Sequence, residues 1–213
     1  RTSLEGGETS VATIRLAGED VRVFVEVMRP PLKLLVCGAG HDAIPLVQLG
    51  SGLGWKVVVV DDRDEFLDRS RFPGAADLVK SEPVKAAQSA GVDDRTHALV
   101  MSHNYLRDRD YLKSFLGTDV AYIGMLGPRA RLERLLDDLS GEGIEPSPAE
   151  RERVHGPAGL DIGAEGPGEI AAAIVSEILA VSRRRGAGFL RARSGPIHER
   201  VGTGATGAAA ATG

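Results

Sequence analysis

One cysteine, one tryptophan and no long apolar run set the first limits on this 213-residue chain. The single cysteine excludes an internal disulfide framework and any metal site built from cysteines alone. The longest apolar runs, at 34–37 and 57–60, have the length of strands and are far shorter than the ~18 residues that cross a bilayer. The start of the chain has no basic-then-apolar signal peptide. These absences indicate a cytoplasmic protein without a membrane span.

The chain carries little excess charge of either sign. Its formal net charge of -4 gives no general reason to bind nucleic acid or a membrane surface. Hydrophobic residues make up 42% of the chain, which is enough to bury a core, and the length suffices for one domain plus an appendage. The first residue is Arg1 rather than Met, which is compatible with a fragment of a longer protein.

The N-terminal segment predicts a β-hairpin. Val11 to Leu16 and Val21 to Val27 are rich in β-forming residues, and residues 17–20 form a four-residue loop between them. A hairpin alone is marginally stable, so we expect it to dock on another element. Pro30-Pro31 then acts as a short linker. The chain therefore divides into the hairpin at 1–30, a Rossmann-like cofactor-binding domain at 31–200 and a disordered Gly/Ala/Thr tail at 201–213.

The domain after the linker begins with a strand, a tight turn, a helix and a second strand. They span 33–37, 38–40, 42–52 and 57–60, which is typical of a parallel crossover unit. The fold class is therefore α/β, a Rossmann-like parallel sheet with flanking helices. The same periodicities predict strands at 78–79, 98–101 and 120–125, helices at 108–115, 128–140 and 167–184, a Gly/Pro loop at 141–149 and a short strand or turn at 160–163.

The turn after the first strand, residues 38–43, has the pattern G-x-G-x-x-A. Gly38 permits the tight turn, Gly40 lets a phosphate approach the backbone, and Ala43 lets the helix pack closely on the strand. The helix N-terminus offers N–H donors to an anion. Asp61 follows Gly38 by 23 residues, a spacing at which an acid can bind a ribose hydroxyl of NAD.

Two observations keep the ligand of this loop open. The glycines alone are also compatible with a Rossmann-like fold that has lost its ligand. In addition, His41 and Asp42 place a titratable pair where dinucleotide loops usually carry small or apolar residues. A carboxylate beside a phosphate is electrostatically unfavourable, so the pattern favours an anionic cofactor more firmly than it favours NAD used for hydride transfer.

Ligands of open α/β sheets bind beyond the carboxyl ends of the strands. The polar and glycine residues predicted to lie there are our candidate cofactor-binding residues, and no catalytic residue is identified among them. They are Gly38, Ala39, Gly40, His41, Asp42, Asp61, Asp62, Arg63, Ser102, His103, Asn104, Gly127 and Arg129.

Other chemistry at this edge is weighed against simpler roles. In one hypothesis, His41 and His103 form a metal-binding or acid/base pair. In the favoured hypothesis, each caps a helix or hydrogen-bonds a loop carbonyl, so no metal site is predicted. No G-x-S-x-G elbow accompanies Ser102-His103, so a hydrolase is not indicated. Cys37 is expected to be an inert core thiol. Arg129 and Arg131 could reach a phosphate, but we favour their placement on a solvated helix face.

The stretch before the last predicted helix has two interpretations. Gly163, Gly166, Pro167 and Gly168 precede the helix and form either a second anion site or a simple turn into it. The apolar run from Ile170 to Val181 within the helix serves either the core or the interface of a homodimer, which is the commonest kind of oligomer.

Several stretches taken together resemble one family, the XdhC/CoxI proteins, which are accessory factors of xanthine dehydrogenase and related molybdenum hydroxylases. The resemblance covers about residues 20 to 200 and is specific, since a generic Rossmann enzyme would not combine these motifs. They are LLVCGAGHDA at 34–43, VVDDR at 59–63, RFPGA at 71–75, MSHN at 101–104, AYIGMLGPR at 121–129, HGPAGLDIGA at 155–164 and PGEIAAAIVSEILA at 167–180.

The resemblance implies a function that composition cannot give. Such proteins bind molybdenum cofactor, a phosphorylated and sometimes nucleotide-linked pterin that carries molybdenum. They hold it while a cysteine desulfurase sulfurates it, and they then deliver it to the apo-hydroxylase. The glycine loop would hold the phosphate or nucleotide end, and no covalent chemistry by the factor itself is required.

The sequence departs from the family pattern at two places. Members usually carry a longer N-terminal domain with its own glycine and cysteine motif. The resemblance therefore implies that the hairpin at 1–30 is the remnant of a missing or truncated domain. Residues 165–169 also lack the threonine-proline-glutamate helix start, and a missing hydroxyl cap costs up to about 1 kcal/mol. A cofactor-binding maturation factor is the favoured function. The alternatives are an NAD(P)-dependent oxidoreductase, for which no second domain with a proton donor is evident, and a nucleotide-binding regulatory module.

Overall fold

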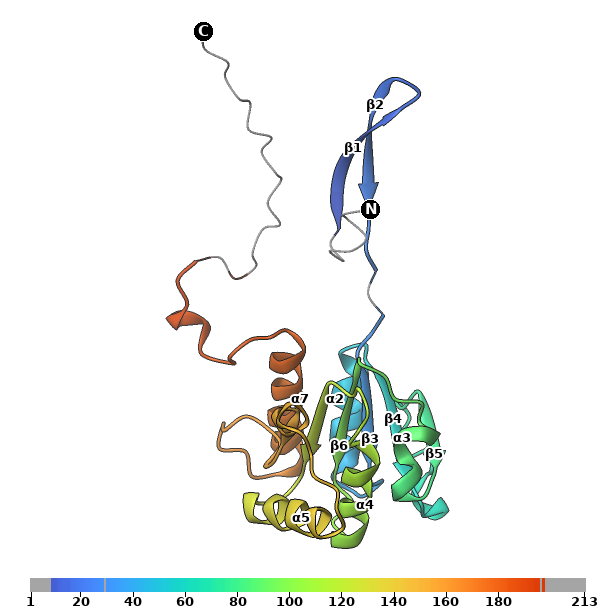
Figure 1. The fold of residues 1–213 in the computed structure, drawn as a ribbon, viewed down its shortest axis with the longest axis vertical. Coiled ribbons are helices and arrows are strands. Elements are labelled where there is room, and N and C mark those ends of the chain that lie inside the picture. Colours follow the sequence, from blue (N-terminus) through green and yellow to red (C-terminus); the bar gives the residue numbers. More distant parts are fainter. Residues whose placement is uncertain (1–8, 29, 196, 198–213) are drawn as a thin grey trace.

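The computed structural model describes residues 9–28, 30–195 and 197 of the chain. They form an N-terminal β-hairpin and an α/β domain (Figure 1). The predicted disorder of the tail at 201–213 lies outside the described residues. Among the helices of the described part, none has the length and apolar character needed to cross a membrane.

The core of the domain is a six-stranded sheet in the order β5-β4-β3-β6-β7-β8, with every neighbouring pair parallel. The chain starts in the middle of the sheet, adds two strands on one side and then three on the other. This is the predicted Rossmann-like arrangement. The strands are β3 (Lys33–Cys37), β4 (Lys56–Asp61), β5 (Asp77–Lys80), β6 (Thr96–Val100), β7 (Tyr122–Met125) and β8 (Val154–His155).

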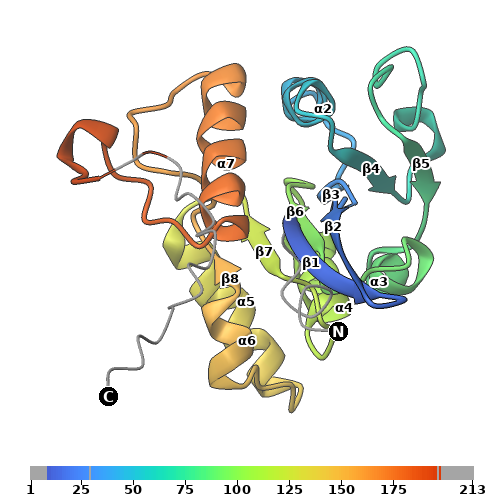
Figure 2. The ribbon, with the colours of Figure 1, turned by 90° about the horizontal axis from the view of Figure 1, so that it is seen from above.

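Helices cover both faces of the sheet, as Figure 2 shows from above. One face carries α2 (Ala43–Gly52) and α7 (Pro167–Ser182), and the other carries α3 (Ala86–Ser89), α4 (Tyr105–Phe115) and α5 (Arg129–Gly141). Alternate strand residues face opposite layers, so that Leu34 and Val36 pack under α2 and α7 while Leu35 and Cys37 pack on the other side. The apolar run of α7 is used in this core, since Ala171, Ala173, Ile174, Val175 and Ile178 are all buried.

The sequence analysis predicted neither α3 nor the 3-10 helices at 64–66, 83–85 and 190–192, and it also missed two further short elements. The first is α6 (Pro148–Glu152), which starts at the end of the stretch 141–149 that was expected to be a loop. Its N-cap is Ser147, whose side chain accepts from the Glu150 N–H in a capping box. Hydrogen bonds from Ser147 and from the Gly117 N–H lower the pKa of Glu150 to about 2. The second element is β8, which adds two residues to the sheet beside β7. Residues 160–163 form no strand.

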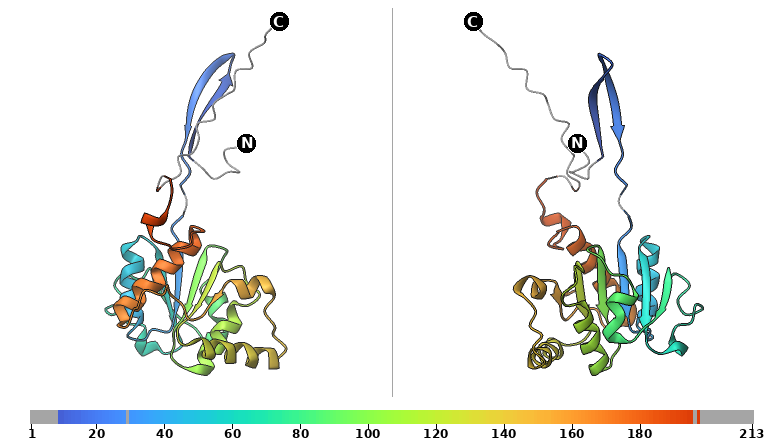
Figure 3. Two further views of the ribbon diagram at one scale, coloured as in Figure 1. Left: turned by 90° about the vertical axis from the view of Figure 1, so that its left-hand side faces the viewer. Right: turned by 45° about the vertical axis from the view of Figure 1, so that its right-hand side comes forward.

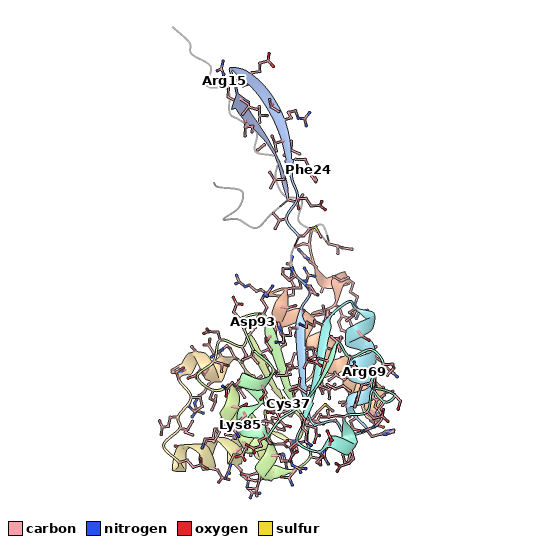
Figure 4. The ribbon with its side chains drawn as sticks, turned by 90° about the vertical axis from the view of Figure 1, so that its right-hand side faces the viewer. Arg15, Phe24, Cys37, Arg69, Lys85 and Asp93 are labelled. Carbon is pink, nitrogen blue, oxygen red and sulfur yellow. The ribbon has the colours of Figure 1, made fainter. Side chains whose placement is uncertain are left out.

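The hairpin consists of β1 (Ser10–Leu16) and β2 (Glu19–Val25), and its loop has two residues rather than the predicted four. Ala17 and Gly18 both take positive φ angles, of 52° and 93°, as a tight turn matched to the twist of the strands requires. The hairpin extends away from the α/β domain (Figure 3). Phe24 lies on it 64% exposed, whereas Cys37 lies inside the domain (Figure 4).

Candidate functional site

The strand order reverses between β3 and β6, and the carboxyl edge at that point is where open parallel sheets bind ligands. The loop after β3 and the loop after β6 flank this position. They are in backbone contact, because a Cβ on Gly38 would lie 2.7 Å from the Ser102 Cα and 2.8 Å from the Ser102 nitrogen. The structure thus brings together two of the predicted groups of site residues.

The two glycines of the loop have different roles. Gly38 has a φ of +109° and no room for a side chain, so it allows the close contact with the loop after β6. A Cβ on Gly40 would meet nothing within 4 Å. The missing side chain of Gly40 therefore leaves the outer side of the loop open, which is the property that an approaching phosphate requires.

The loop also presents unused hydrogen-bond donors. In the part of the chain that the structure describes, the backbone N–H groups of Gly40, His41 and Asp42 have no acceptor. Asp42 is the N-cap of α2, but its side chain makes no capping hydrogen bond. These donors and the partial positive charge of the helix N-terminus make the exposed side of the loop suitable for an anion.

The carboxylate of Asp42 pairs with His103, at 3.1 Å from the Nε2. This contact links the start of α2 to the loop after β6. The partner of His103 is therefore this aspartate, and not His41 as in the metal hypothesis. Among the described residues, no group of three or more His, Cys, Asp or Glu side chains is arranged to hold a metal ion.

Asp61 is 1% exposed, and its side chain is hydrogen-bonded to the backbone of the glycine loop. Its carboxylate accepts from the Ala39 N–H at 2.7 Å and from the Arg63 N–H, Nε and Nη2 at 2.8–2.9 Å. Burial alone would raise the pKa of Asp61, but the bonds from Arg63 and Ala39 lower it to about 2. This carboxylate is fully engaged within the protein, so a ribose hydroxyl would have to displace one of these donors to reach it.

Asp108 has the same role on the other side of the strand reversal. It is 1% exposed, and it accepts from the Ser102 N–H at 3.1 Å, the Ser102 Oγ at 2.5 Å and the Arg131 Nη2 at 2.6 Å. Each of the two loops is thus anchored by a buried aspartate that also holds an arginine.

Three arginines stand at this edge, each beside an aspartate. Arg63 pairs with Asp61, Arg131 pairs with Asp108, and Arg107 lies 3.1 Å from Asp62. A guanidinium group has five N–H donors, and these pairs use only some of them. Arg63 also lies over the Phe66 ring, with its guanidinium carbon 3.8 Å from the centroid. The arginines are therefore fixed in place while they retain donors for an anion.

The remaining predicted residues lie around this centre. Asn104 accepts from the Arg107 N–H as the N-cap of α4. Gly127 has a φ of +116°, and a Cβ there would lie 3.1 Å from the Arg131 Cδ. Arg129 is 81% exposed and pairs with Glu133 along the outer surface of α5, which matches the solvated helix face favoured for it from the sequence.

Sequence reasoning missed the contributions of Arg107 and Asp108. A signal for Asp108 exists, because it shares the spacing of the buried residues Tyr111, Leu112 and Phe115. An acid on the apolar stripe of a helix is expected to be paired, since an isolated buried charge is very costly. That spacing would have identified Asp108 as an anchor of this edge.

Helix α7 closes one side of the site. A small cavity of ≈ 20 Å³ lies between it and α2, lined by Asp42, Leu46, Met101, Ile170 and other residues. It has room for about one water molecule. An organic ligand would therefore lie on the open side of the glycine loop.

The start of α7 is hydrogen-bonded to a residue of the same helix. The carboxylate of Glu169 accepts from the Glu165 N–H at 3.0 Å, which favours a simple turn over a second anion site.

The segment between β8 and α7 is tied down by Glu177. This carboxylate accepts from the Tyr122 hydroxyl at 2.5 Å and the Gly159 N–H at 2.8 Å, and it lies 3.2 Å from the His155 Nδ1. Burial raises the pKa of Glu177, but these hydrogen bonds lower it below the usual value. Glu177 thus links β7, β8 and the following loop to α7.

The replacement Glu177→Gln is expected to lower the free energy of unfolding by about 1–2 kcal/mol, because the charge-assisted bonds to Tyr122 and His155 become weaker. Urea unfolding at neutral pH measures this. The double variant Glu177→Gln/Tyr122→Phe should lose less than the sum of the two single changes, since the partners interact directly. Strict additivity would contradict the assigned contact.

Comparison with known proteins matches residues 34–178 to the family model described as the XdhC Rossmann domain. A probable xanthine dehydrogenase subunit of Bacillus subtilis (strain 168) is 33% identical over 183 residues, covering 85% of this chain and 53% of that protein. The Escherichia coli (strain K12) "Uncharacterized protein YqeB" is 32% identical over 181 residues, covering 84% and 32%. A crystal structure described as a xanthine dehydrogenase from Bacillus halodurans superposes with a TM-score of 0.65 at 31% identity, covering 74% of this chain and 44% of that one. The chain spans about half or less of the length of each.

Proposed function

We propose, from the premise that this chain belongs to the XdhC family through its Rossmann domain, that it binds molybdenum cofactor and delivers it to a xanthine dehydrogenase-type hydroxylase. The family is related to the maturation of xanthine dehydrogenase. The proposal adds that the phosphate-bearing end of the cofactor lies against residues 38–42.

The observation that supports this most directly is the exposed side of the glycine loop. Three consecutive N–H groups there have no acceptor within the described chain, the space outside Gly40 is open, and the helix N-terminus adds positive potential. Arg63 and Arg131 flank the loop with fixed guanidinium groups. This donor set fits a phosphate. The pterin carries its own molybdenum, so the absence of a metal-binding cluster among the described residues does not conflict with it.

Within this proposal the residues of the chain bind and orient, and the molybdenum centre supplies redox chemistry only once it is in the hydroxylase. Gly40, His41 and Asp42 would donate their N–H groups to phosphate oxygens. Asp61 and Asp108 would keep Arg63 and Arg131 in position. The apo-hydroxylase and a cysteine desulfurase would be the partners, in the cytoplasm, and a homodimer is compatible with such a role.

The change Gly40→Asp is expected to weaken cofactor binding at least about tenfold, because it places a carboxylate where the phosphate would lie. Binding is measured by ultrafiltration of the protein with isolated molybdenum cofactor and quantification of the retained molybdenum. The matched control is Gly141→Asp at the end of α5, where a Cβ also meets nothing within 4 Å. It should bind like the unmodified chain.

The same samples distinguish the alternative ligands. A ligand at 100 times its Kd stabilises the folded state by about 2.7 kcal/mol, which is readily detected as a shift in melting temperature. Stabilisation by NADH or NADPH with no response to molybdenum cofactor would favour the oxidoreductase alternative and contradict the proposal. Unchanged cofactor binding by the Gly40 variant would place the site elsewhere.

A further inference from the structure

The C-terminal end of α7 is rich in positive charge. Residues 183–193 contain five arginines and no acid, in a chain whose formal net charge is -4. Helix α7 ends as Arg184 adopts a φ of 52°, with the Arg184 N–H donating to the Val181 carbonyl and the Arg185 N–H to the Ala180 carbonyl. Glycine is the usual residue at this position of a helix end. An arginine here accepts a conformational cost that glycine would avoid.

Large apolar side chains accompany these arginines. Phe189 is 77% exposed and Leu190 is 63% exposed. The Arg191 guanidinium carbon lies 4.9 Å from the Phe189 ring centroid. Exposed aromatic and aliphatic groups next to arginine are the combination that protein interfaces favour.

Two grooves run along this end of α7. One, of ≈ 1040 Å³, lies at the amino edge of the sheet and is lined by Trp55, Leu179, Arg183 and Arg184, with Asp94 as an acidic residue on its wall. The other, of ≈ 1060 Å³, lies between α7 and the segment after it. Leu179 and Arg183 line both grooves, so the two form one continuous surface whose lining combines apolar side chains with arginines. We call it the α7-end surface, defined by Leu179, Arg183, Arg184, Phe189, Leu190 and Arg191.

We propose that the α7-end surface docks an acidic segment of a partner protein that carries apolar side chains between its carboxylates. The arginines match the acids, and the apolar side chains that line the grooves can contact apolar side chains, which a nucleic acid backbone does not have. The carboxylates of a short bound segment would also lie within ~10 Å of the arginines, which is the distance over which exposed charges attract one another at moderate salt concentration. An extended anionic surface would additionally face the net negative charge of the rest of the chain.

This surface lies at the amino edge of the sheet, opposite to the edge that carries the glycine loop (Figure 1). Docking there leaves the candidate cofactor site open. The proposal therefore concerns a second site and does not depend on cofactor binding.

The test uses the full chain and fluorescence anisotropy of a labelled synthetic peptide made of three Glu-Leu-Asp-Glu-Phe units. Binding is expected to weaken about tenfold in Arg183→Gln/Arg184→Gln and also in Phe189→Ser/Leu190→Ser, and to weaken as salt increases. The matched control, Arg22→Gln/Arg151→Gln, removes the same charge from exposed positions outside the surface and should bind like the unmodified chain. A peptide with lysine in place of the acids should not bind.

Several outcomes would overturn the proposal. They are no binding of the acidic peptide, equal binding by all variants, or binding only to phosphatidylglycerol vesicles or to duplex DNA. Melting temperatures establish that the variants are folded. Retention of molybdenum by the same variants is measured separately, so that failure of one proposal is distinguishable from failure of the other.

Discussion

Replacement of Gly38 by alanine is expected to lower the free energy of unfolding by about 4 kcal/mol. The φ of +109° is strained for any residue with a Cβ, and the new atom would lie 2.7 Å from the Ser102 Cα. The atoms that it would meet are backbone atoms of Met101 and Ser102, directly after the central strand β6, so they do not yield easily. Chemical denaturation monitored by circular dichroism measures the loss. A variant that is already partly unfolded at room temperature without denaturant would also agree with this prediction.

The control for this prediction is Gly40→Ala in the same loop. Its Cβ would meet nothing within 4 Å and its φ is not in the positive range, so its stability should stay within about 0.5 kcal/mol of the unmodified chain. Equal stability of the two variants would show that the contact between the loops after β3 and β6 is not as close as described.

Replacement of Asp61 by asparagine is expected to cost about 3 kcal/mol at neutral pH. Asparagine keeps the shape but loses the charge that four hydrogen bonds now share, and one of its two oxygens becomes an amide donor facing other donors. Arg63 would lose the carboxylate with which it forms its ion pair. The measurement is again the free energy of unfolding, and Asp64→Asn, at an exposed acid three residues later, is the matched control.

The loss of unfolding free energy caused by Asp61→Asn should become smaller as the pH falls. The pKa of Asp61 in the folded chain is about 2, below the ordinary value of about 3.9. A depressed folded pKa contributes stability that is fully present above the ordinary pKa and is lost as the pH falls through the folded one. The difference between unmodified and variant chains should therefore be constant above about pH 5 and shrink between about pH 4 and pH 2. A difference that does not change over that range would contradict the assigned hydrogen bonds.

The fold could be predicted where the pattern was long and repeated. The strand at 33–37, the turn, the helix and the strand at 56–61 were located within about two residues, because burial on both faces gives continuous apolar runs. β8 has two residues and therefore shows no periodicity. The hairpin loop was predicted too long because Glu19 and Asp20 are polar, yet they pair with Leu16 and Arg15 within the strands.

The position of the candidate site could be predicted, but the role of each residue could not. Strand ends can be read from the sequence, so Asp61 and Ser102 were placed at the correct edge. Whether a carboxylate points inward depends on the tertiary packing, and Asp61 is buried where a ligand contact was expected. Arg129 and Arg131 are two positions apart on α5, and only the docking of that helix decides that Arg131 reaches Asp108.

The strand order also has a consequence for synthesis of the chain. β3 is the central strand, with Leu34, Leu35 and Val36 completely buried, and one of its edges pairs with β4 while the other waits for β6. A nascent chain that has emerged only as far as β5 can pair one side of this strand but not the other. Open edges of apolar strands are templates for intermolecular pairing. A ribosome-bound intermediate that ends before Thr96 is therefore expected to expose this edge of β3 to intermolecular pairing, until β6 emerges and covers it.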